Sequence, residues 1–338
     1  MRRIAVMGSG SWGTGFGMVL ADAGGEVAMW AREPEVVEDI NHKHHNNAYH
    51  PGLELPPSMW ASGDVQQVLR GAQIVVLAIP SQTLRDNLSA WREMLPPDVT
   101  LVSLMKGIEL GTVMRMSQVI AEVTGLPESQ VAVVSGPNLA REVVQRQPAA
   151  TTVACGDEGR AQALAEATTT AYFRPYYTTD VVGTELGGAV KNVIALANGM
   201  AYGLGFGENA QASLITRGLA EMSRLGAACG ANPLTFLGLA GIGDLIATCT
   251  SPLSRNRTFG ENLGRGLTVD ETIAKTKQTC EGVKSCQSIL DLATRNGVDM
   301  PITEQVVAVV HKGMAPREML YNFMSRDPKA EQGHEGLS

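Results

Sequence analysis

The sequence predicts an α/β protein in which an N-terminal doubly wound parallel sheet is followed by an all-α C-terminal domain. Short apolar runs alternate with helical stretches in the first half, a glycine-rich turn follows the first run, and strand signals stop near residue 180. Because 338 residues are many for one core, we expect domains over residues 1–180 and 181–326. The polar segment 327–338 has little to bury and is predicted to be a disordered tail.

The candidate strands are mostly uninterrupted apolar runs, which are typical of strands covered on both faces. They lie at residues 4–7, 27–30, 74–79, 101–104, 131–134 and 151–154. Between residues 182 and 204 apolar side chains recur at steps of four and three, so a long amphipathic helix is expected there. Further helices are predicted at 213–229, 245–250, 283–295 and 303–312.

Composition and charge exclude several classes of protein. No apolar run approaches the roughly 18 residues that a membrane-spanning helix needs, so no span is expected. The net charge of -7 argues against general nucleic-acid binding. The 5 cysteines form no close-spaced ligand pair and the histidines at 42–50 lack carboxylate partners, so no metal site is predicted. Reduced thiols and a cytoplasmic location are expected. The oligomeric state stays open, a homodimer included.

A glycine-rich segment follows the first candidate strand, where residues 8–13 read Gly-Ser-Gly-Ser-Trp-Gly. Gly8 suits a tight turn, Gly10 lets the backbone approach a pyrophosphate, and Gly13 lets the next helix pack closely on the strand. The helix N-terminus would offer its N–H groups to the phosphates. Because strand, helix and second strand come in the right order, we expect a dinucleotide site of the Rossmann type.

The end of the second strand bears on the choice of cofactor. An acidic residue there would bind the adenosine ribose of NAD, whereas an arginine suits the 2′-phosphate of NADP. This chain places Arg32 at that point, so NADP is favoured over NAD. The alternative is that Arg32 is a solvated surface residue and that Glu33 binds the ribose.

Lys191 is the strongest candidate for acid-base chemistry. It lies in the middle of the long predicted helix, among small residues on the side opposite the apolar stripe. An ammonium group in a confined pocket can have its pKa lowered enough to exchange a proton near neutrality. The alternative is a lysine that reaches solvent along the helix surface. Asp244 and Thr248 share a helix face one turn apart, although Asp244 could instead be a simple N-cap.

Other polar groups follow strands or turns. Lys106, Gly136 and Asn138 come directly after candidate strands, at the edge where open α/β sheets bind ligands. Residues 254–257 read Ser-Arg-Asn-Arg, and their two guanidinium groups and amide suit a phosphate. The alternative is a solvated basic turn.

Together these motifs resemble the NAD(P)-dependent glycerol-3-phosphate dehydrogenases over nearly the whole chain. The resemblance is carried by the glycine segment with Trp12, Asn41-x-x-His44-x-Asn46-x-x-Tyr49 before Pro51-Gly52, Lys106-Gly107-Ile108-Glu109, Ser135-Gly136-Pro137, Lys191-Asn192-Val193-Ile194-Ala195, Gly241-x-Gly243-Asp244-Leu245, Ser254-Arg255-Asn256-Arg257 and Glu281-Gly282. Three places differ from the family pattern, the first being Gly15, where alanine is usual. Asn138 stands where a small hydroxyl residue is usual, and Thr279-Cys280 replaces Val-Ala before Glu281.

The resemblance implies that the protein reduces dihydroxyacetone phosphate to sn-glycerol 3-phosphate with NAD(P)H, which would feed glycerophospholipid synthesis. It implies Lys191 as proton donor and acceptor, with Lys106 and Asp244 completing the catalytic set. Implied substrate contacts are Lys106, Gly136, Asn138, Lys191, Asp244, Thr248, Ser254, Arg255 and Asn256. Beyond Gly8, Gly10, Gly13 and Glu33, implied cofactor contacts are Ser11, Trp12, Arg32, Lys106, Ala140, Arg255, Thr279 and Glu281.

Two other functions stay open. One is a related dehydrogenase that acts on a β-hydroxyacid or a sugar acid, and the other is a non-catalytic nucleotide sensor. The pair Arg255 and Asn256 argues against the first, because it suits a phosphorylated substrate. Lys191 with Asp244 argues against the second, because a sensor has no need of a proton donor.

Overall fold

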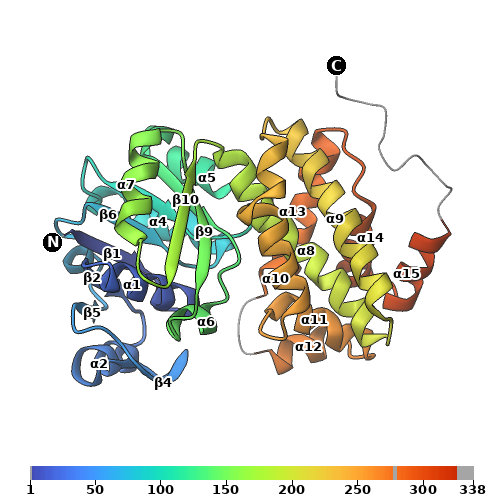
Figure 1. Cartoon of the computed structure of the whole chain (residues 1–338), viewed down its shortest axis with the longest axis horizontal. Helices are drawn as coiled ribbons and strands as arrows, with labels where there is room; N and C mark the ends of the chain where they lie inside the picture. The colour runs from blue at the N-terminus through green and yellow to red at the C-terminus, as the bar shows by residue number, and fades with distance from the viewer. Residues whose placement is uncertain (1, 277–279, 326–338) are drawn as a thin grey trace.

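The computed structural model describes residues 2–276 and 280–325. Its first half is built on an eight-stranded sheet with the order β10-β9-β8-β7-β6-β1-β2-β5 (Figure 1). The strands are β1 (Arg3–Met7), β2 (Glu26–Trp30), β5 (Met59–Ser62), β6 (Ile74–Leu77), β7 (Thr100–Ser103), β8 (Val131–Ser135), β9 (Ala149–Cys155) and β10 (Phe173–Thr178). A small hairpin, β3 (His45–Asn46) and β4 (His50–Glu54), stands apart from this sheet. The six predicted strands are confirmed, with shifts of one or two residues at most ends.

The sheet is doubly wound, as predicted, because β1 alternates its side chains between two cores. Ile4 and Val6 belong to one cluster of buried residues, and Ala5 and Met7 belong to another. Helices α1 (Ser11–Asp22), α2 (Pro34–Lys43), α6 (Ala140–Val144) and α7 (Glu158–Thr168) contribute to the first cluster. Helices α3 (Val65–Leu69), α4 (Leu84–Trp91) and α5 (Met116–Thr124) contribute to the second.

The sheet is not parallel throughout, since β9 runs antiparallel to β8. The connection between them holds only the five-residue helix α6. Such a helix is about 7.5 Å long, whereas a five-residue strand spans about 16 Å, so α6 cannot carry the chain back along the sheet. β9 therefore returns directly as an antiparallel neighbour.

The edge strands β5 and β10 are absent from the sequence prediction. Residues in β10 are mostly exposed or half-buried, and the strand contains Pro175. A proline is tolerated at a sheet edge, where its missing N–H is not needed for pairing. Mixed polarity of this kind hides an edge strand from a search for apolar runs.

The second half is helical, as predicted. Its helices are α8 (Val181–Gly203), α9 (Glu208–Ala228), α10 (Asp244–Thr250), α11 (Arg255–Gly264), α12 (Val269–Lys275), α13 (Glu281–Arg295), α14 (Pro301–Lys312) and α15 (Pro316–Met324). Figure 1 shows α8 inside this group, with α9, α13 and α14 nearby. The predicted tail at 327–338 lies outside the described residues.

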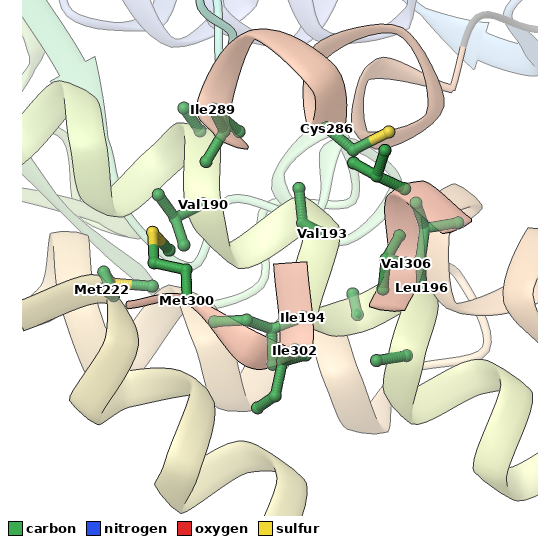
Figure 2. Packing of buried hydrophobic residues seen from close by; sticks show 14 of the residues in the cluster. Val190, Val193, Ile194, Leu196, Met222, Cys286, Ile289, Met300, Ile302 and Val306 are labelled. Atoms are coloured by element: carbon green, nitrogen blue, oxygen red, sulfur yellow. The ribbon is translucent and has the colours of Figure 1, made fainter. Parts of the chain in front are cut away.

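The central helix α8 is buried on all sides rather than along one stripe, since every residue from 183 to 201 is buried. Val190 and Ile194 pack with Met222 of α9, Ile289 of α13 and Ile302 of α14 in one cluster (Figure 2). The side of α8 opposite this cluster is also buried, because glycines there let another helix pack against its backbone. A Cβ atom on Gly199 would lie 2.0 Å from the carbonyl oxygen of Arg257, so α11 touches the α8 backbone directly. The prediction of an amphipathic α8 did not foresee that α11 would cover its second side.

Three further expectations can be compared with the structure. Within residues 2–276 and 280–325, no helix is long and apolar enough to cross a membrane. All five cysteines are free thiols. In the same part of the chain, no group of three or more histidine, cysteine or acidic side chains could hold a metal ion.

Candidate active site

A cavity of about 1140 Å³ opens at the carboxyl ends of the parallel strands and reaches across to α8, α10 and α11. Most residues predicted to bind cofactor or substrate line it: Gly8, Gly10, Ser11, Trp12, Gly13, Arg32, Glu33, Lys106, Asn138, Ala140, Lys191, Thr248, Ser254, Arg255, Asn256 and Glu281. Gly136 and Asp244 do not line the cavity but contact Lys106, which does. Thr279 lies outside the described residues.

The glycine-rich segment has the geometry that a dinucleotide phosphate needs. Gly8 has a φ of +125°, and a Cβ atom there would lie 2.5 Å from the carbonyl oxygen of Ala78. A Cβ atom on Gly13 would lie 2.2 Å from the Gly8 carbonyl oxygen, so the helix packs tightly on the strand. A Cβ atom on Gly10 would meet no protein atom within 4 Å. The space before the N-terminus of α1 is therefore clear for a pyrophosphate.

The β3–β4 hairpin holds this segment in place, a role that the sequence analysis missed. Asn46 donates hydrogen bonds to the Ser9 carbonyl and to the Thr14 hydroxyl, both at 2.9 Å. The His50 Nε2–H group donates to the Ser11 carbonyl at 2.8 Å. Burial lowers the pKa of His50, although its bond to Ser11 opposes this. Of the histidines in this region, His50 therefore supports the nucleotide loop, whereas His45 contacts the Leu53 carbonyl of its own hairpin.

Arg32 and Glu33 follow β2 and form an exposed ion pair of 2.9 Å. Both side chains line the cavity. The two predicted readings treated these residues as alternatives, one binding the cofactor and the other not. In the structure the two side chains pair with each other. A ligand that binds the Arg32 guanidinium must therefore compete with the Glu33 carboxylate.

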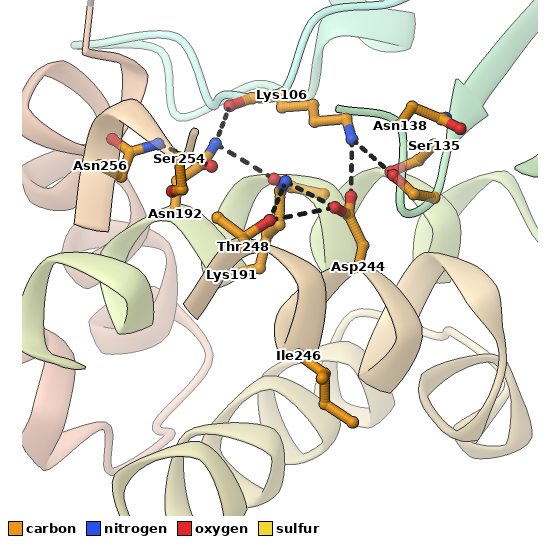
Figure 3. A network of polar contacts seen from close by, with 12 residues as sticks. Lys106, Ser135, Asn138, Lys191, Asn192, Asp244, Ile246, Thr248, Ser254 and Asn256 are labelled. Atoms are coloured by element: carbon orange, nitrogen blue, oxygen red, sulfur yellow. Dashed lines mark hydrogen bonds and ion pairs between the residues drawn. The ribbon is translucent and has the colours of Figure 1, made fainter. Parts of the chain in front are cut away.

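The centre of the site is one carboxylate held between two lysines. Lys191 donates to Asp244 Oδ1 and to the Thr248 hydroxyl, both at 2.7 Å. Lys106 donates to Asp244 Oδ2 at 2.6 Å and to the Gly136 carbonyl at 3.2 Å. Figure 3 shows the two lysines converging on Asp244 from different elements, Lys191 from α8 and Lys106 from the loop after β7. This cluster of two lysines and one aspartate therefore joins the sheet to the helical half.

The alternative readings of Lys191 and Asp244 are wrong. Lys191 is 6% exposed and Asp244 is 2% exposed, so the lysine does not reach solvent along the helix. The residue before α10 is Gly243, and the Asp244 carboxylate binds the two lysines instead of capping the helix. Both residues belong to one buried polar cluster.

Burial and charge shape the proton affinities of this cluster. Burial lowers the pKa of Lys191 to about 8, with the Asp244 carboxylate opposing and the Lys106 ammonium adding to the effect. Burial alone would raise the pKa of Asp244, but the charges of Lys106 and Lys191 outweigh it and the pKa is lowered. Two ammonium groups against one carboxylate leave a net positive charge, which favours an anionic ligand.

The first turn of α11 brings a third part of the site to the cavity. Ser254 caps this helix by accepting the Arg257 N–H at 3.2 Å, and Arg255 follows at the cavity wall. The predicted second guanidinium is not there. Arg257 is buried, lies 4.3 Å over the Tyr202 ring and pairs with Glu261 of its own helix. A single arginine therefore faces the cavity from residues 254–257.

Asn256 and Asn138 make contacts within the protein. The Asn256 amide nitrogen donates to Asn192 Oδ1 at 2.9 Å, while its oxygen accepts the Gly282 N–H at 3.0 Å. Asn138 donates to the Thr151 hydroxyl at 2.8 Å, and in Figure 3 its amide turns away from Asp244. The Asn256 amide is therefore held at both ends, whereas the buried Asn138 oxygen has no hydrogen-bond partner among the described residues.

Glu281, at the first turn of α13, reaches back to the sheet. Its carboxylate accepts the Ser81 hydroxyl at 2.6 Å and the Ser81 N–H at 3.3 Å. Ser81 follows β6, so this pair joins the two halves of the chain at the rim of the cavity. Sequence reasoning named Glu281, but no local pattern pairs it with Ser81, which lies 200 residues away at the end of a strand.

Comparisons with known proteins place these features in context. The family model described as NAD-dependent glycerol-3-phosphate dehydrogenase N-terminus matches residues 3–161, and the corresponding C-terminus model matches residues 180–321. The chain is 62% identical over 330 residues to a glycerol-3-phosphate dehydrogenase (NAD(P)+) of Streptomyces griseus, covering 98% of each protein. It is 61% identical over 333 residues to the enzyme of the same name from Thermobifida fusca, covering 98% of this chain and 99% of that one.

Solved structures agree with this likeness. The fold is similar to glycerol-3-phosphate dehydrogenase from Coxiella burnetii, with a TM-score of 0.90 and 35% identity, covering 96% of this chain and 98% of the other. A D-mandelate dehydrogenase has a TM-score of 0.62 at 16% identity, covering 94% of this chain and 99% of that one. That second likeness concerns the fold alone.

Proposed function

Since the chain belongs to the family of NAD-dependent glycerol-3-phosphate dehydrogenases, we propose that it reduces dihydroxyacetone phosphate to sn-glycerol 3-phosphate. One observation carries the proposal. A buried lysine with a pKa lowered to about 8 lies at the wall of a cavity that also holds a dinucleotide-type glycine loop and the first turn of α11. This arrangement puts a proton donor between a place for a cofactor and a place for an anion.

The cofactor side of the cavity fits NADP or NAD. Gly8, Gly10, Ser11 and Trp12 would hold the pyrophosphate, since the space in front of Gly10 is clear and the N–H groups of α1 open toward it. When bound, the nicotinamide cofactor supplies the hydride. Arg32 is suited to a 2′-phosphate, and Glu33 is suited to a free ribose.

Lys191 is proposed to donate a proton to the substrate's carbonyl oxygen during reduction and to take it back during oxidation. Asp244 holds the ammonium group in place through its 2.7 Å bond, and Thr248 fixes a second direction. Lys106 shares the same carboxylate, so its positive charge is held near the developing oxyanion. The chain thus supplies position, charge and a mobile proton.

The phosphate of the substrate is proposed to bind at the first turn of α11. A ten-residue helix leaves N–H groups of its first turn without partners inside the helix, and its dipole favours an anion there. Arg255 adds a guanidinium at the same edge of the cavity. Because the Asn256 amide already bonds Asn192 and Gly282, the backbone of this turn is better placed than that amide to serve a phosphate.

The wider setting rests on the same proposal. The product is the backbone on which glycerophospholipids are built, so we propose a place in their synthesis. Domains over 1–180 and 181–326 are supported by the clusters of buried residues, since the cluster of the helical half takes only Ile108 and Val113 from the first 180 residues. Five free thiols support a reducing compartment, and a cytoplasmic location is proposed on that ground. We also propose a homodimer.

The test is to follow NADPH and NADH absorbance with purified protein and dihydroxyacetone phosphate. Oxidation of either cofactor, dependent on the ketose phosphate, is the expected result. Turnover with β-hydroxyacids or sugar acids in place of dihydroxyacetone phosphate would assign the protein to a related dehydrogenase. Cofactor binding without turnover on any phosphorylated ketose would favour the sensor.

A further inference from the structure

Cys280 lies immediately before α13 and makes a contact that the mechanism above does not use. Its thiol donates to Asn256 Oδ1 at 2.8 Å, next to the Gly282 N–H that donates to the same oxygen at 3.0 Å. Cys280 and Asn256 are each 8% exposed, so solvent offers no substitute partner. Burial raises the pKa of the Cys280 thiol to about 12, and the group therefore remains a protonated donor at neutral pH.

The orientation of the Asn256 amide follows from its neighbours. Asn192 donates through Nδ2 to the backbone carbonyls of Lys106 at 3.2 Å and Gly188 at 3.3 Å. Its Oδ1 must therefore face the NH2 group of Asn256, which lies 2.9 Å away. The Asn256 side-chain oxygen therefore points toward α13. The two amides form a directed chain from Cys280 to the main chain of Lys106, part of which is drawn in Figure 3.

This chain touches both ends of the proposed substrate site. Asn256 belongs to the first turn of α11, beside Arg255, and Lys106 bonds Asp244 with its side chain. The approach is close, because a Cβ atom on Gly282 would lie 2.7 Å from Asn256 Oδ1. A shift of the Asn256 amide therefore moves the turn where the phosphate is expected.

We propose that Cys280 is a positioning residue for the phosphate end of the substrate site, acting through the Asn256 amide. The inference rests on the proposed function, in which the first turn of α11 takes the phosphate. Without the thiol, Asn256 Oδ1 keeps one donor instead of two, and the amide and its turn lose part of their restraint. A hydrogen bond of this kind corresponds to roughly a two- to tenfold change in affinity.

The experiment compares four variants at saturating NADPH. Cys280→Ala and Cys280→Val remove the donor, the second without leaving a cavity, whereas Cys280→Ser keeps a donor. Cys286→Ala is the matched control, since Cys286 is a buried thiol of α13 that contacts the Val283 carbonyl and His311 instead of Asn256. Each protein is measured for kcat, for KM with dihydroxyacetone phosphate, for KM with NADPH, and for competitive inhibition by inorganic phosphate.

We expect the Ala and Val variants of Cys280 to raise KM for dihydroxyacetone phosphate and the inhibition constant of phosphate together, by roughly two- to tenfold. The KM for NADPH should change less than twofold, and Cys280→Ser and Cys286→Ala should resemble the wild type. The inference is overturned if Cys280→Ala behaves as wild type, if Val restores what Ala loses, or if Ser is as impaired as Ala. A wild-type protein that ignores dihydroxyacetone phosphate would overturn the proposed function and this inference with it.

Discussion

Lys191 illustrates how a single residue depends on its surroundings. In the sequence it is a lysine on the polar side of a helix, and the ordinary reading is a side chain that reaches solvent. In the structure α10 and the loop after β7 cover that side, and the ammonium group meets Asp244 and Thr248. Removal from water is what lowers its pKa toward the range where proton transfer is useful.

Replacing this lysine tests its proposed role. Lys191→Met should reduce kcat by about a hundred- to ten-thousandfold, because methionine keeps the apolar stem but cannot donate a proton. The binding of NADPH, measured by fluorescence titration, should be little changed, since the glycine loop is intact. A variant that kept most of its turnover would remove Lys191 from the chemistry.

The lowered pKa also predicts opposite pH profiles for the two directions. Reduction needs Lys191 protonated, so its kcat/KM should fall as the pH rises through about 8. Oxidation of glycerol 3-phosphate needs the neutral amine, so its kcat/KM should rise over the same interval. Initial rates between pH 6 and 10 measure both limbs. Parallel profiles in the two directions would contradict a proton carried by this residue.

Arg32 tests the cofactor preference at the residue scale. Arg32→Ala should raise KM for NADPH far more than KM for NADH, because only NADPH carries the 2′-phosphate that the guanidinium would bind. Glu33→Gln is the companion variant. It releases Arg32 from its 2.9 Å ion pair and should lower KM for NADPH. Equal effects of Arg32→Ala on both cofactors would show that the arginine is a surface residue.

At the scale of elements, the contact between α8 and α11 sets the shape of the site. Gly199 on α8 and Gly260 on α11 each lie against backbone atoms of the other helix, where a Cβ atom would be about 2 Å from a carbonyl oxygen. Only glycine permits this approach. The first turn of α11 and Lys191 thereby line the same cavity, as the proposed binding of one small substrate by both requires.

The first turn of α11 is tested by Arg255→Ala. A hydrogen bond to a charged group contributes about 1.5–3 kcal/mol, which is roughly a ten- to a hundredfold change in affinity. At saturating NADPH the variant should lose at least that factor in kcat/KM with dihydroxyacetone phosphate. Unphosphorylated dihydroxyacetone, which we expect to be a very poor substrate, should be affected much less. Similar losses for both ketones would assign Arg255 to the cofactor or to the fold.

At the scale of the whole molecule, polar contacts join the sheet to the helical half. Two of these contacts border the cavity: Lys106 pairs with Asp244, and Ser81 bonds Glu281. A third contact lies elsewhere, where Glu185 of α8 accepts the Arg115 guanidinium at 2.5 Å and the Ser117 N–H at 2.8 Å. The glutamate is buried and ties α8 to the start of α5.

Removing Glu185 therefore tests how firmly the two halves are joined. Glu185→Ala leaves the Arg115 charge and the Ser117 N–H without their partner, which should cost about 3–5 kcal/mol of unfolding free energy. Urea denaturation followed by fluorescence measures the loss. Glu93→Ala is the matched control, because Glu93 pairs with Arg92 at the surface and its loss should cost less than about 1 kcal/mol. Equal losses in the two variants would show that the interface contact has no special weight.

Local patterns in the sequence determined the elements and the cofactor loop. Apolar runs marked the inner strands because those strands are covered on both faces, and the glycine segment marked the turn before α1 because only glycine fits there. The sequence patterns did not predict the edge strand β10 or the antiparallel direction of β9. At an edge the burial pattern is mixed, and strand direction depends on the length of the connection rather than on the strand itself.

The residues that we propose to react could be named from the sequence, whereas the tertiary structure decided which contacts they make. Lys191 and Asp244 are 53 residues apart, and Lys106 and Asp244 are 138 apart. No periodicity within a helix or a strand predicts contacts between residues so far apart in the sequence. Likewise, Arg257 and Arg255 read alike as arginines of one turn, but packing buries the first against Tyr202 and leaves the second at the cavity. Sequence patterns indicate which faces of an element are buried and where the backbone needs glycine. The pKa of a side chain and its ion pairs depend instead on the groups that the rest of the chain places within a few ångströms.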